Sequence, residues 1–183
     1  IFLAWKVIDS KYALDNKYVK VRQDLCILPN GSTSDFFTVE IKDWTLVVAF
    51  TPSKEMVLVK QYRHSTSQEL TELPAGVINK NEKPADAIKR EFLEETGMEL
   101  EQLNSIGTWF TMSGKSNCTV SVFFGLTGKH RQAQQLDEEE NIQVIFKKPR
   151  EVLQMIALGE IKSAVYIAGI LAAKEKYPEY FSE

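Results

Sequence analysis

The sequence predicts an α+β fold in which helices pack against a mixed β-sheet. Three observations support this class: strand-like segments run to residue 62, a helix with clear boundaries follows at 84–96, and further strands and helical segments come after it. The chain has 183 residues, of which 44% are hydrophobic and 26% are charged. It can therefore form one domain with a sizeable core, carrying a small N-terminal addition.

Segments rich in β-branched and aromatic residues predict the N-terminal strands. These strands are expected at 5–8, 19–27, 36–40, 45–50 and 56–62, with turns at 12–17 and 29–34. We therefore divide the chain into an N-terminal antiparallel β region at 1–45 and a second domain at 46–183.

Local signals mark both ends of the helix at 84–96. Pro84 suits the first helical turn, and Asp86 complements the positive end of the helix dipole. Gly97 supplies a left-handed stop. After this helix, strands are expected near 103–110, 119–127 and 141–146, and helices at 151–158 and 161–177.

Three glutamates share one side of this helix. At roughly 100° per residue, Glu91, Glu94 and Glu95 fall in one arc beside the apolar residues Ile88 and Phe92. Carboxylates this close repel one another unless a cation lies between them. The arc therefore predicts a metal site in an enzyme that acts on phosphates.

An ordinary solvated helix would explain Glu94 and Glu95 alone, but it does not explain the wider spacing. Seven residues stand at fixed positions: Gly76, Glu82, Arg90, Glu91, Glu94, Glu95 and Gly97. Chance agreement at all seven is on the order of one in a million for a chain of this length.

With the apolar residues Phe92 and Met98, these positions match the Nudix box, so the chain resembles the Nudix hydrolase superfamily across residues 76–98. The flanking Gln-Tyr-Arg at 61–63 and Glu-Leu-Pro-Ala-Gly at 72–76 resemble the branch of ADP-ribose pyrophosphatases and nucleoside diphosphate sugar hydrolases. The resemblance implies an α/β/α sandwich. It also implies hydrolysis of the diphosphate bond in a nucleoside diphosphate sugar, and a homodimer formed through the N-terminal region.

The cofactor expected at the glutamate arc is Mg²⁺, with Mn²⁺ as the alternative. Glu91 and Glu95 are one helical turn apart and are assigned as the principal ligands, with Glu94 as a bridging or water-mediated third. By resemblance, the backbone carbonyl of Ala75 adds another ligand. Arg90, at i,i+4 from Glu94, can orient that side chain. Glu82 has three open roles: holding Arg90, contacting a metal through water, or starting the helix.

Hydrolysis also needs a group that deprotonates the attacking water. Related enzymes take it from an acidic segment before a strand, and residues 137–142 occupy that place here. Glu140 is the preferred base and Glu138 the second candidate. A solvated acidic loop is the alternative interpretation for either residue.

Arg63 is the main candidate to bind the diphosphate, and Lys115 and Arg22 are weaker ones. Glu72 belongs to the same matched flank and is included with the substrate-binding residues. Trp44 could stack a nucleobase, although a buried structural tryptophan is the more common outcome.

The loop at 112–118 departs from the Pro-Gly and Ser-x-Glu pattern of many ADP-ribose pyrophosphatases. Ser113 replaces the proline, and Cys118 stands where the glutamate is usual. ADP-ribose and a GDP-hexose such as GDP-mannose therefore both stay open as substrates. Neither His64 nor His130 has metal-ligand spacing, so both are expected at the surface.

Composition narrows the partners further. A net charge of −3 without a basic block argues against nucleic acid, and the apolar stretch at 164–173 is too short to span a membrane. Cys26 and Cys118 are too few for a disulfide framework and indicate a reducing cytoplasm. Because the chain begins with Ile1, we expect natural residues to precede it.

Two other functions share these sequence features. A catalytically silent Nudix-like domain could bind a nucleotide sugar as a regulatory module, but such a module has no need for three mutually repelling glutamates. An isomerase on the same scaffold is disfavoured because its expected cysteine contexts are not recognisable.

Overall fold

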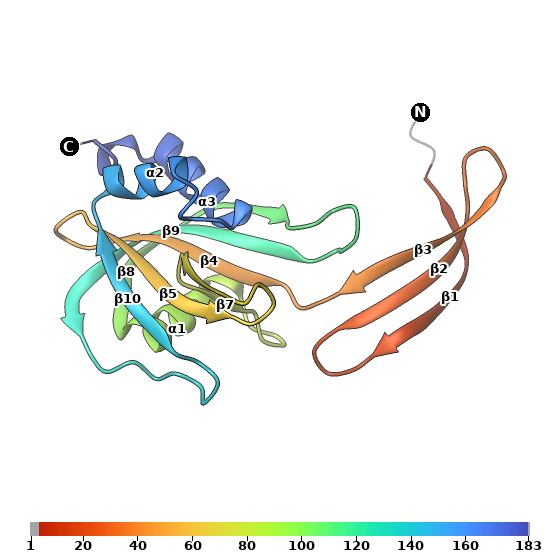
Figure 1. Ribbon diagram of the computed structural model, residues 1–183, viewed down its shortest axis with the longest axis horizontal. Coiled ribbons are helices and arrows are strands. Elements are labelled where there is room, and N and C mark those ends of the chain that lie inside the picture. The colour runs from red at the N-terminus through yellow and green to blue at the C-terminus, as the bar shows by residue number, and fades with distance from the viewer. Residues whose placement is uncertain (1–3, 183) are drawn as a thin grey trace. The chain divides into compact units, whose positions relative to one another are not determined.

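The computed structural model describes residues 4–182, which form two compact units (Figure 1). Unit 1 contains the residues up to 43 together with 110–119, and unit 2 contains 44–109 and the residues from 120 onward. The sequence placed segment 110–119 in the second domain. In the structure it joins unit 1, because Lys115 O accepts a 2.7 Å hydrogen bond from Val39 N and Asp43 Oδ1 accepts one of 2.7 Å from Thr119 N.

Unit 1 is built on a three-stranded antiparallel sheet in the order β1-β2-β3. Its strands are β1 (Lys6–Asp15), β2 (Lys20–Ile27) and β3 (Thr33–Glu40). The register pairs Lys20 with both Asp15 and Glu40, and two register shifts interrupt the β1–β2 pairing. The expected antiparallel character of the N-terminal region is confirmed.

The turn expected at 12–17 is wrong, because β1 continues to Asp15. Tyr12 and Leu14 pair with β2, while Asn16 closes the turn that follows. Asn16 Oδ1 accepts hydrogen bonds from Tyr18 N at 2.9 Å and Val19 N at 3.0 Å. An asparagine side chain that accepts a hydrogen bond from the backbone two residues ahead favours a turn. The sequence prediction therefore started this turn too early, at residue 12 and not at Asn16.

Unit 2 contains a seven-stranded mixed sheet. Its main order is β10-β5-β4-β9-β8, with β6 paired to β5 and β7 paired to β4. The strands are β4 (Trp44–Phe50), β5 (Met56–Arg63), β6 (Gln68–Glu72), β7 (Ala75–Val77), β8 (Met98–Phe110), β9 (Thr119–Arg131) and β10 (Ile142–Lys147). The sheet is mixed because β4 runs parallel to β9 and antiparallel to β5 and β7. The predicted α+β class is confirmed.

Helices cover both faces of this sheet, α1 (Pro84–Thr96) on one and α2 (Pro149–Ala157) and α3 (Ala164–Lys176) on the other (Figure 1). Side chains alternate along β4, so Val47 packs in the cluster that contains Phe92 of α1. Leu46 and Val48 pack in the cluster that contains Ile170 of α3. A 3₁₀ helix at Pro178–Tyr180 follows. In the described part of the chain, no helix is long and apolar enough to span a membrane.

Several element boundaries differ from the sequence prediction. Strands β6 and β7 were missed, since both are short. Strand β8 begins at Met98 rather than near 103, because Met98 and Leu100 are buried while Glu99 and Glu101 are exposed, a two-residue alternation typical of a strand. Helix α2 begins at Pro149, where Glu151 accepts a 2.9 Å hydrogen bond from Lys148 N.

Gly97 ends α1 in the predicted left-handed conformation, with φ +70°, and its N–H donates to Leu93 O at 2.8 Å. A Cβ at this position would lie 2.1 Å from Gln132 O. Gly97 therefore meets two constraints, a left-handed φ and the close approach of a second backbone segment.

We expect Gly97→Ala to lower the free energy of unfolding by at least about 2 kcal/mol, because alanine adds left-handed strain and a clash with backbone. Gly159 is the matched control, since its φ is +72° and a Cβ added there would have nothing within 4 Å. Gly159→Ala should cost only about 1 kcal/mol. Urea denaturation of both variants measures the difference, and equal losses would contradict the role of the Gln132 contact.

Candidate active site

The site forms where β7 passes beside α1. Strand β7 pairs with β4 through Thr45 and Gly76, and Val47 N donates to Pro74 O at 3.1 Å. This pairing holds the backbone of Ala75 and Gly76 next to the glutamates of α1. A Cβ at Gly76 would lie 2.0 Å from Glu91 Cδ, so glycine is what lets the Glu91 carboxylate lie against this strand.

Glu95 is the most buried of the three helix glutamates, with 4% of its surface exposed. Its Oε2 accepts a hydrogen bond from Ala75 N at 3.2 Å. Burial raises the pKa of Glu95 well above its usual value, and the charges of Glu91 and Glu140 raise it further. Burial also raises the pKa of Glu91, with the charges of Glu94 and Glu140 adding to the effect against the opposing charge of Arg90.

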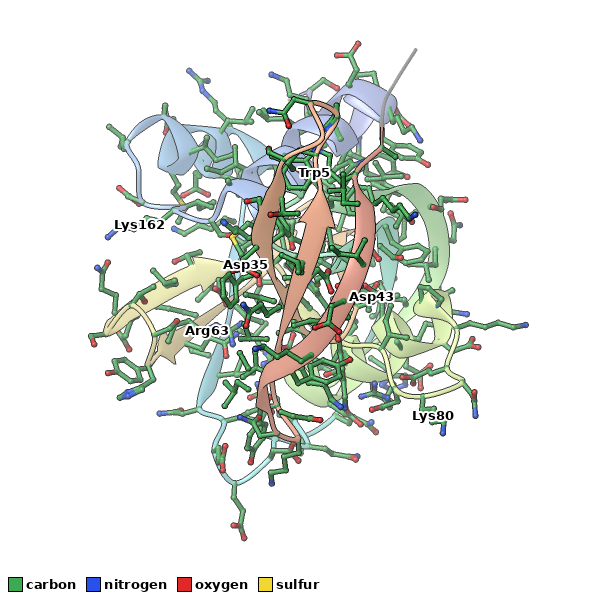
Figure 2. The ribbon with its side chains drawn as sticks, turned by 90° about the vertical axis from the view of Figure 1, so that its right-hand side faces the viewer. Trp5, Asp35, Asp43, Arg63, Lys80 and Lys162 are labelled. Atoms are coloured by element: carbon green, nitrogen blue, oxygen red, sulfur yellow. The ribbon has the colours of Figure 1, made fainter. Side chains whose placement is uncertain are left out.

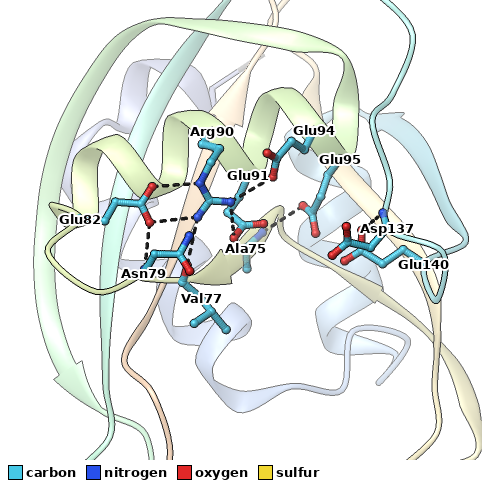
Figure 3. A network of polar contacts seen from close by, with 10 residues as sticks. All are labelled: Ala75, Val77, Asn79, Glu82, Arg90, Glu91, Glu94, Glu95, Asp137 and Glu140. Atoms are coloured by element: carbon cyan, nitrogen blue, oxygen red, sulfur yellow. Dashed lines mark hydrogen bonds and ion pairs between the residues drawn. The ribbon is translucent and has the colours of Figure 1, made fainter. Parts of the chain in front are cut away.

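Arg90 joins the other carboxylates into one network (Figure 3). Its Nε and Nη2 donate to the two oxygens of Glu82 at 2.9 and 3.0 Å. Its Nη1 lies 2.8 Å from Glu91 Oε1 and 3.0 Å from Glu94 Oε2. Nη2 also donates to Val77 O at 3.2 Å. The guanidinium therefore fixes the helix glutamates and the end of β7 together.

Glu82 serves as the main anchor of Arg90. Hydrogen bonds from Arg90 and from the backbone N–H of Asn79 lower the pKa of Glu82 to about 2. Of the three roles left open for Glu82, the structure shows the contact with Arg90. Its bond with Asn79 N, 2.9 Å long, also ties it to the turn before α1.

The acidic loop between β9 and β10 supplies a further carboxylate. Glu140 extends toward Glu95 in Figure 3, and its charge raises the pKa of both Glu91 and Glu95. Its Oε2 accepts a 3.2 Å hydrogen bond from Asp137 N, and its own N–H donates to Asp137 O at 3.0 Å. Glu138 and Glu140 are both exposed in this turn. Glu140 therefore interacts electrostatically with Glu91 and Glu95.

Arg63, at the end of β5 (Figure 2), is bound to Glu72. Its Nε and Nη2 donate to Glu72 Oε2 at 3.0 and 2.7 Å, and Gln61 Nε2 donates to the same oxygen at 3.0 Å. Glu72 is 4% exposed, so its carboxylate needs these donors. The two matched flanks of the box, 61–63 and 72–76, are therefore in direct contact.

Tyr166 of α3 belongs to this network and could not be identified from the sequence. It is 5% exposed, and burial followed by the charge of Glu72 raises its pKa. Trp44 packs edge-on against its ring with centroids 6.0 Å apart. The partly buried Trp44 thus has a packing role beside the site, and its stacking on a base stays a prediction.

The other two predicted substrate-binding residues, Arg22 and Lys115, belong to unit 1. Arg22 Nε donates to Asp24 at 2.9 and 3.1 Å, and Arg22 also pairs with Glu40. Lys115 Nζ lies 5.3 Å from the centre of the Phe36 ring. Both cations line a cavity of about 350 Å³ inside unit 1. Outside these networks, His64 and His130 are exposed as expected, and Cys26 and Cys118 are buried thiols.

Comparison with known families agrees with this geometry. The NUDIX domain model matches residues 43–166, which include the whole site of unit 2. The chain belongs to the Nudix family. The model of the nucleoside diphosphate sugar hydrolase N-terminal domain matches residues 5–39, which cover most of the unit 1 sheet.

Curated Nudix relatives cover most of the chain. A methanol dehydrogenase activator of Bacillus methanolicus is 33% identical over 82% of both chains. An ADP-ribose pyrophosphatase of Bacillus subtilis (strain 168) is 28% identical over 93% of this chain and 94% of its own. A GDP-mannose pyrophosphatase of Escherichia coli (strain K12) is 28% identical over 64% of this chain and 65% of its own.

A solved structure of an ADP compounds hydrolase has the same fold, with a TM-score of 0.85 over 98% of this chain and 97% of its own. The sequence identity is 12%. The Nudix-type sandwich implied by the sequence is confirmed by this match and by the helices on both faces of the sheet.

The side chains of the Nudix box suit a divalent cation in their chemistry. Within residues 4–182, no three Asp, Glu, His or Cys side chains are already gathered as a metal cluster, and Arg90 forms ion pairs with Glu91 and Glu94. Burial nonetheless opposes ionisation of Glu91 and Glu95, and Glu140 adds to that opposition. A hard cation bound by these oxygens would offset the repulsion, so the donor set fits Mg²⁺ or Mn²⁺.

We expect Gly76→Ala to lower kcat at least about tenfold, because its Cβ would displace the Glu91 carboxylate. Stability should change by less than about 1 kcal/mol, since the displaced atoms are the end of a flexible side chain. Gly159→Ala, far from the box in sequence and in open space, should show the reverse pattern of lower stability and unchanged kcat. Equal kcat in Gly76→Ala and wild type would contradict a catalytic requirement for the Glu91 carboxylate to lie against Gly76.

We also expect the Glu82 contact to be lost in acid. Because the folded-state pKa of Glu82 is lowered from 4.5 to about 2, its stabilising effect is present above pH 4.5 and disappears as the pH falls toward 2. The difference in Tm between wild type and Glu82→Gln should therefore shrink over this range. Glu175→Gln, an exposed control on α3, should leave Tm nearly unchanged at each pH. A Glu82 difference independent of pH would contradict this account.

Proposed function

We propose that this Nudix protein hydrolyses the diphosphate bond of a nucleoside diphosphate sugar, releasing a nucleoside monophosphate and a sugar phosphate. The observation that carries this proposal is that Glu91 and Glu95 lie against the backbone of β7, with Glu140 near enough for its charge to raise the pKa of both. The match to a nucleoside diphosphate sugar hydrolase N-terminal domain supports this substrate class. Relatives named for ADP-ribose and for GDP-mannose keep both substrates as candidates.

The reaction is proposed to depend on Mg²⁺, with Mn²⁺ as the alternative. Glu91 and Glu95 are the proposed principal ligands, with Glu94 as a third and the carbonyl of Ala75 as a backbone ligand. A bound divalent ion neutralises phosphate charge and lowers the pKa of water. Arg90 holds Glu91 and Glu94 from the side, so it limits how far these two carboxylates can move.

Glu140 is the proposed general base. It enters from a loop that faces α1, and its carboxylate can accept the proton of a water aimed at the diphosphate. Its Oε2 accepts a 3.2 Å hydrogen bond from Asp137 N, which leaves Oε1 to accept the proton. Glu138 is the second candidate for this role.

Arg63 is the proposed ligand of the diphosphate in unit 2. The Nε and Nη2 of Arg63 both donate to one oxygen of Glu72, which fixes the orientation of the guanidinium group. Its Nη1 can donate to another acceptor. Lys115 and Arg22 of unit 1 are proposed as weaker substrate-binding residues, and Trp44 is proposed to stack the base. The assignments of Arg63 and Arg22 rest on the planar guanidinium group, which suits phosphate oxygens.

The N-terminal region, 1–45, is proposed to form a homodimer in the cytoplasm. Strand β1 is exposed along its length and carries the apolar residues Val7, Ile8 and Leu14, which are 46% to 52% exposed. Exposed apolar side chains on one strand favour a protein partner over water.

A regulatory module is the second candidate function. The relative that is 33% identical is named as the activator of another enzyme, methanol dehydrogenase. A domain of this kind would bind a nucleotide sugar without needing to cleave it. The two candidates differ in whether isolated protein turns over a diphosphate.

A substrate panel tests the proposal. ADP-ribose, GDP-mannose, UDP-glucose, a dinucleotide and a nucleoside triphosphate are incubated with Mg²⁺, and the products are identified. We expect nucleoside monophosphate and sugar phosphate from at least one nucleotide sugar, and loss of turnover after chelation. Cleavage of triphosphate alone would overturn the substrate class, and no turnover of any compound would favour the regulatory module.

Glu91→Gln is the matched variant for this panel. We expect it to lower kcat by more than about 100-fold, since loss of even an indirect metal partner costs 10- to 100-fold. It should lower stability little, because a neutral amide removes repulsion from Glu94 and Glu140. Glu175→Gln serves as the control with unchanged kcat. A comparable loss of kcat and of stability in Glu91→Gln would mean that the helix is mainly structural.

A further inference from the structure

Four consecutive carbonyls at the end of α1 receive hydrogen bonds from one segment, residues 131–135. Gln135 N donates to Glu94 O at 2.9 Å, and Gln132 N donates to Gly97 O at 2.8 Å. Arg131 Nε donates to Thr96 O at 3.2 Å, and Gln134 Nε2 donates to Glu95 O. These carbonyls have no partners within the helix because α1 stops there, so the segment acts as its C-terminal cap.

Gln134 differs from its neighbours because its side chain spans two elements. The same Nε2 that bonds Glu95 O also donates to Ile142 O at 3.0 Å. Ile142 is the first residue of β10, and Glu95 is in the last turn of α1. One amide group, with its two N–H bonds, therefore ties the helix that bears the glutamates to the start of the strand after the loop.

This bridge closes the acidic loop at both ends. The segment before the loop is held to α1 by the contacts of residues 131–135, and its far end is held at Ile142. Between them, Asp137 and Glu140 form a turn that is closed by two mutual hydrogen bonds. Glu140 lies two residues before Ile142, so its distance from Glu95 depends on where Ile142 is fixed.

We infer that Gln134 is a positioning residue that sets the Glu140 carboxylate against Glu91 and Glu95. The inference rests on the proposed role of Glu140 as general base. Gln134 acts through Glu140 and does not itself touch substrate. The neighbouring contacts of Gln132 and Gln135 use backbone N–H groups, which any residue except proline supplies. The bridge to Ile142 needs the amide side chain at position 134.

Gln134→Met and Gln135→Met form a matched pair. Methionine keeps the length of glutamine and removes both side-chain N–H bonds, while each variant retains its backbone N–H. We expect Gln134→Met to lower kcat by about 10- to 100-fold, since a small misplacement of a catalytic group costs this much. KM should stay within about threefold, because the substrate contacts are elsewhere. Gln135→Met should match wild type in both constants.

A double-mutant cycle with Glu140→Gln separates positioning from general damage. If Gln134 works through Glu140, the double variant should have the kcat of Glu140→Gln alone, to within about twofold. Losses that multiply would overturn the inference, as would a Gln134→Met kcat within twofold of wild type. Full activity in Glu140→Gln would instead overturn the proposed base and this inference with it, whereas a loss in Glu140→Gln without one in Gln134→Met overturns the inference alone.

Folding is monitored by the Tm of each variant. If Gln134→Met is unfolded at the assay temperature, Gln134→Asn takes its place in the cycle. Asparagine keeps the side-chain amide group. It is one methylene shorter than glutamine, so it cannot reach the carbonyls of both Glu95 and Ile142. The same kcat loss, unchanged KM and absence of further loss on the Glu140→Gln background are expected, and independent losses would again overturn the inference.

Discussion

Crowding of like charges against a strand backbone is the constraint on which the site depends. Glu91 and Glu95 extend from α1 into the space beside Gly76 and Ala75, where burial already disfavours their charged forms. Two features make this arrangement stable. Gly76 gives the space, and Arg90 gives a positive charge that is itself held by Glu82. The neighbouring elements of unit 2 position the residues around this space.

The central strand β4 explains why residues from several elements come together at this site. One of its edges pairs with β9 along its length, and the other pairs with β5 at one end and with β7 at the other. Strand β7 therefore enters the sheet where β5 departs from β4. The two faces of β4 pack against different helices, so α1 brings the carboxylates while α3 brings Tyr166 to the Arg63–Glu72 pair from the opposite layer.

The sequence predicted best what depends on local spacing. Helix α1 was expected at 84–96 and is found there, because Pro84, Gly97 and the helical period all act within a few residues. The roles of Gln134 and Tyr166 could not be predicted, since their partners are distant in the chain: 39 residues separate Gln134 from Glu95. Short strands such as β7 were missed for the same reason, because three residues form a strand only through their pairing with β4. The acidic loop, and Glu140 ahead of Glu138 within it, were chosen from the sequence, but the electrostatic interaction of Glu140 with Glu91 and Glu95 depends on how distant segments fold together.

Arg90 has a consequence for the thermodynamics of ion binding. Its guanidinium serves as counter-ion to Glu91 and Glu94 and also donates to Val77 O, so it connects α1 to β7. A divalent ion that draws these oxygens away must compete with that internal cation, and its net affinity is reduced by the interaction it displaces. The contacts of Arg90 with Glu91, Glu94 and Val77 O involve protein groups alone, so they link α1 to β7 without an ion as intermediary.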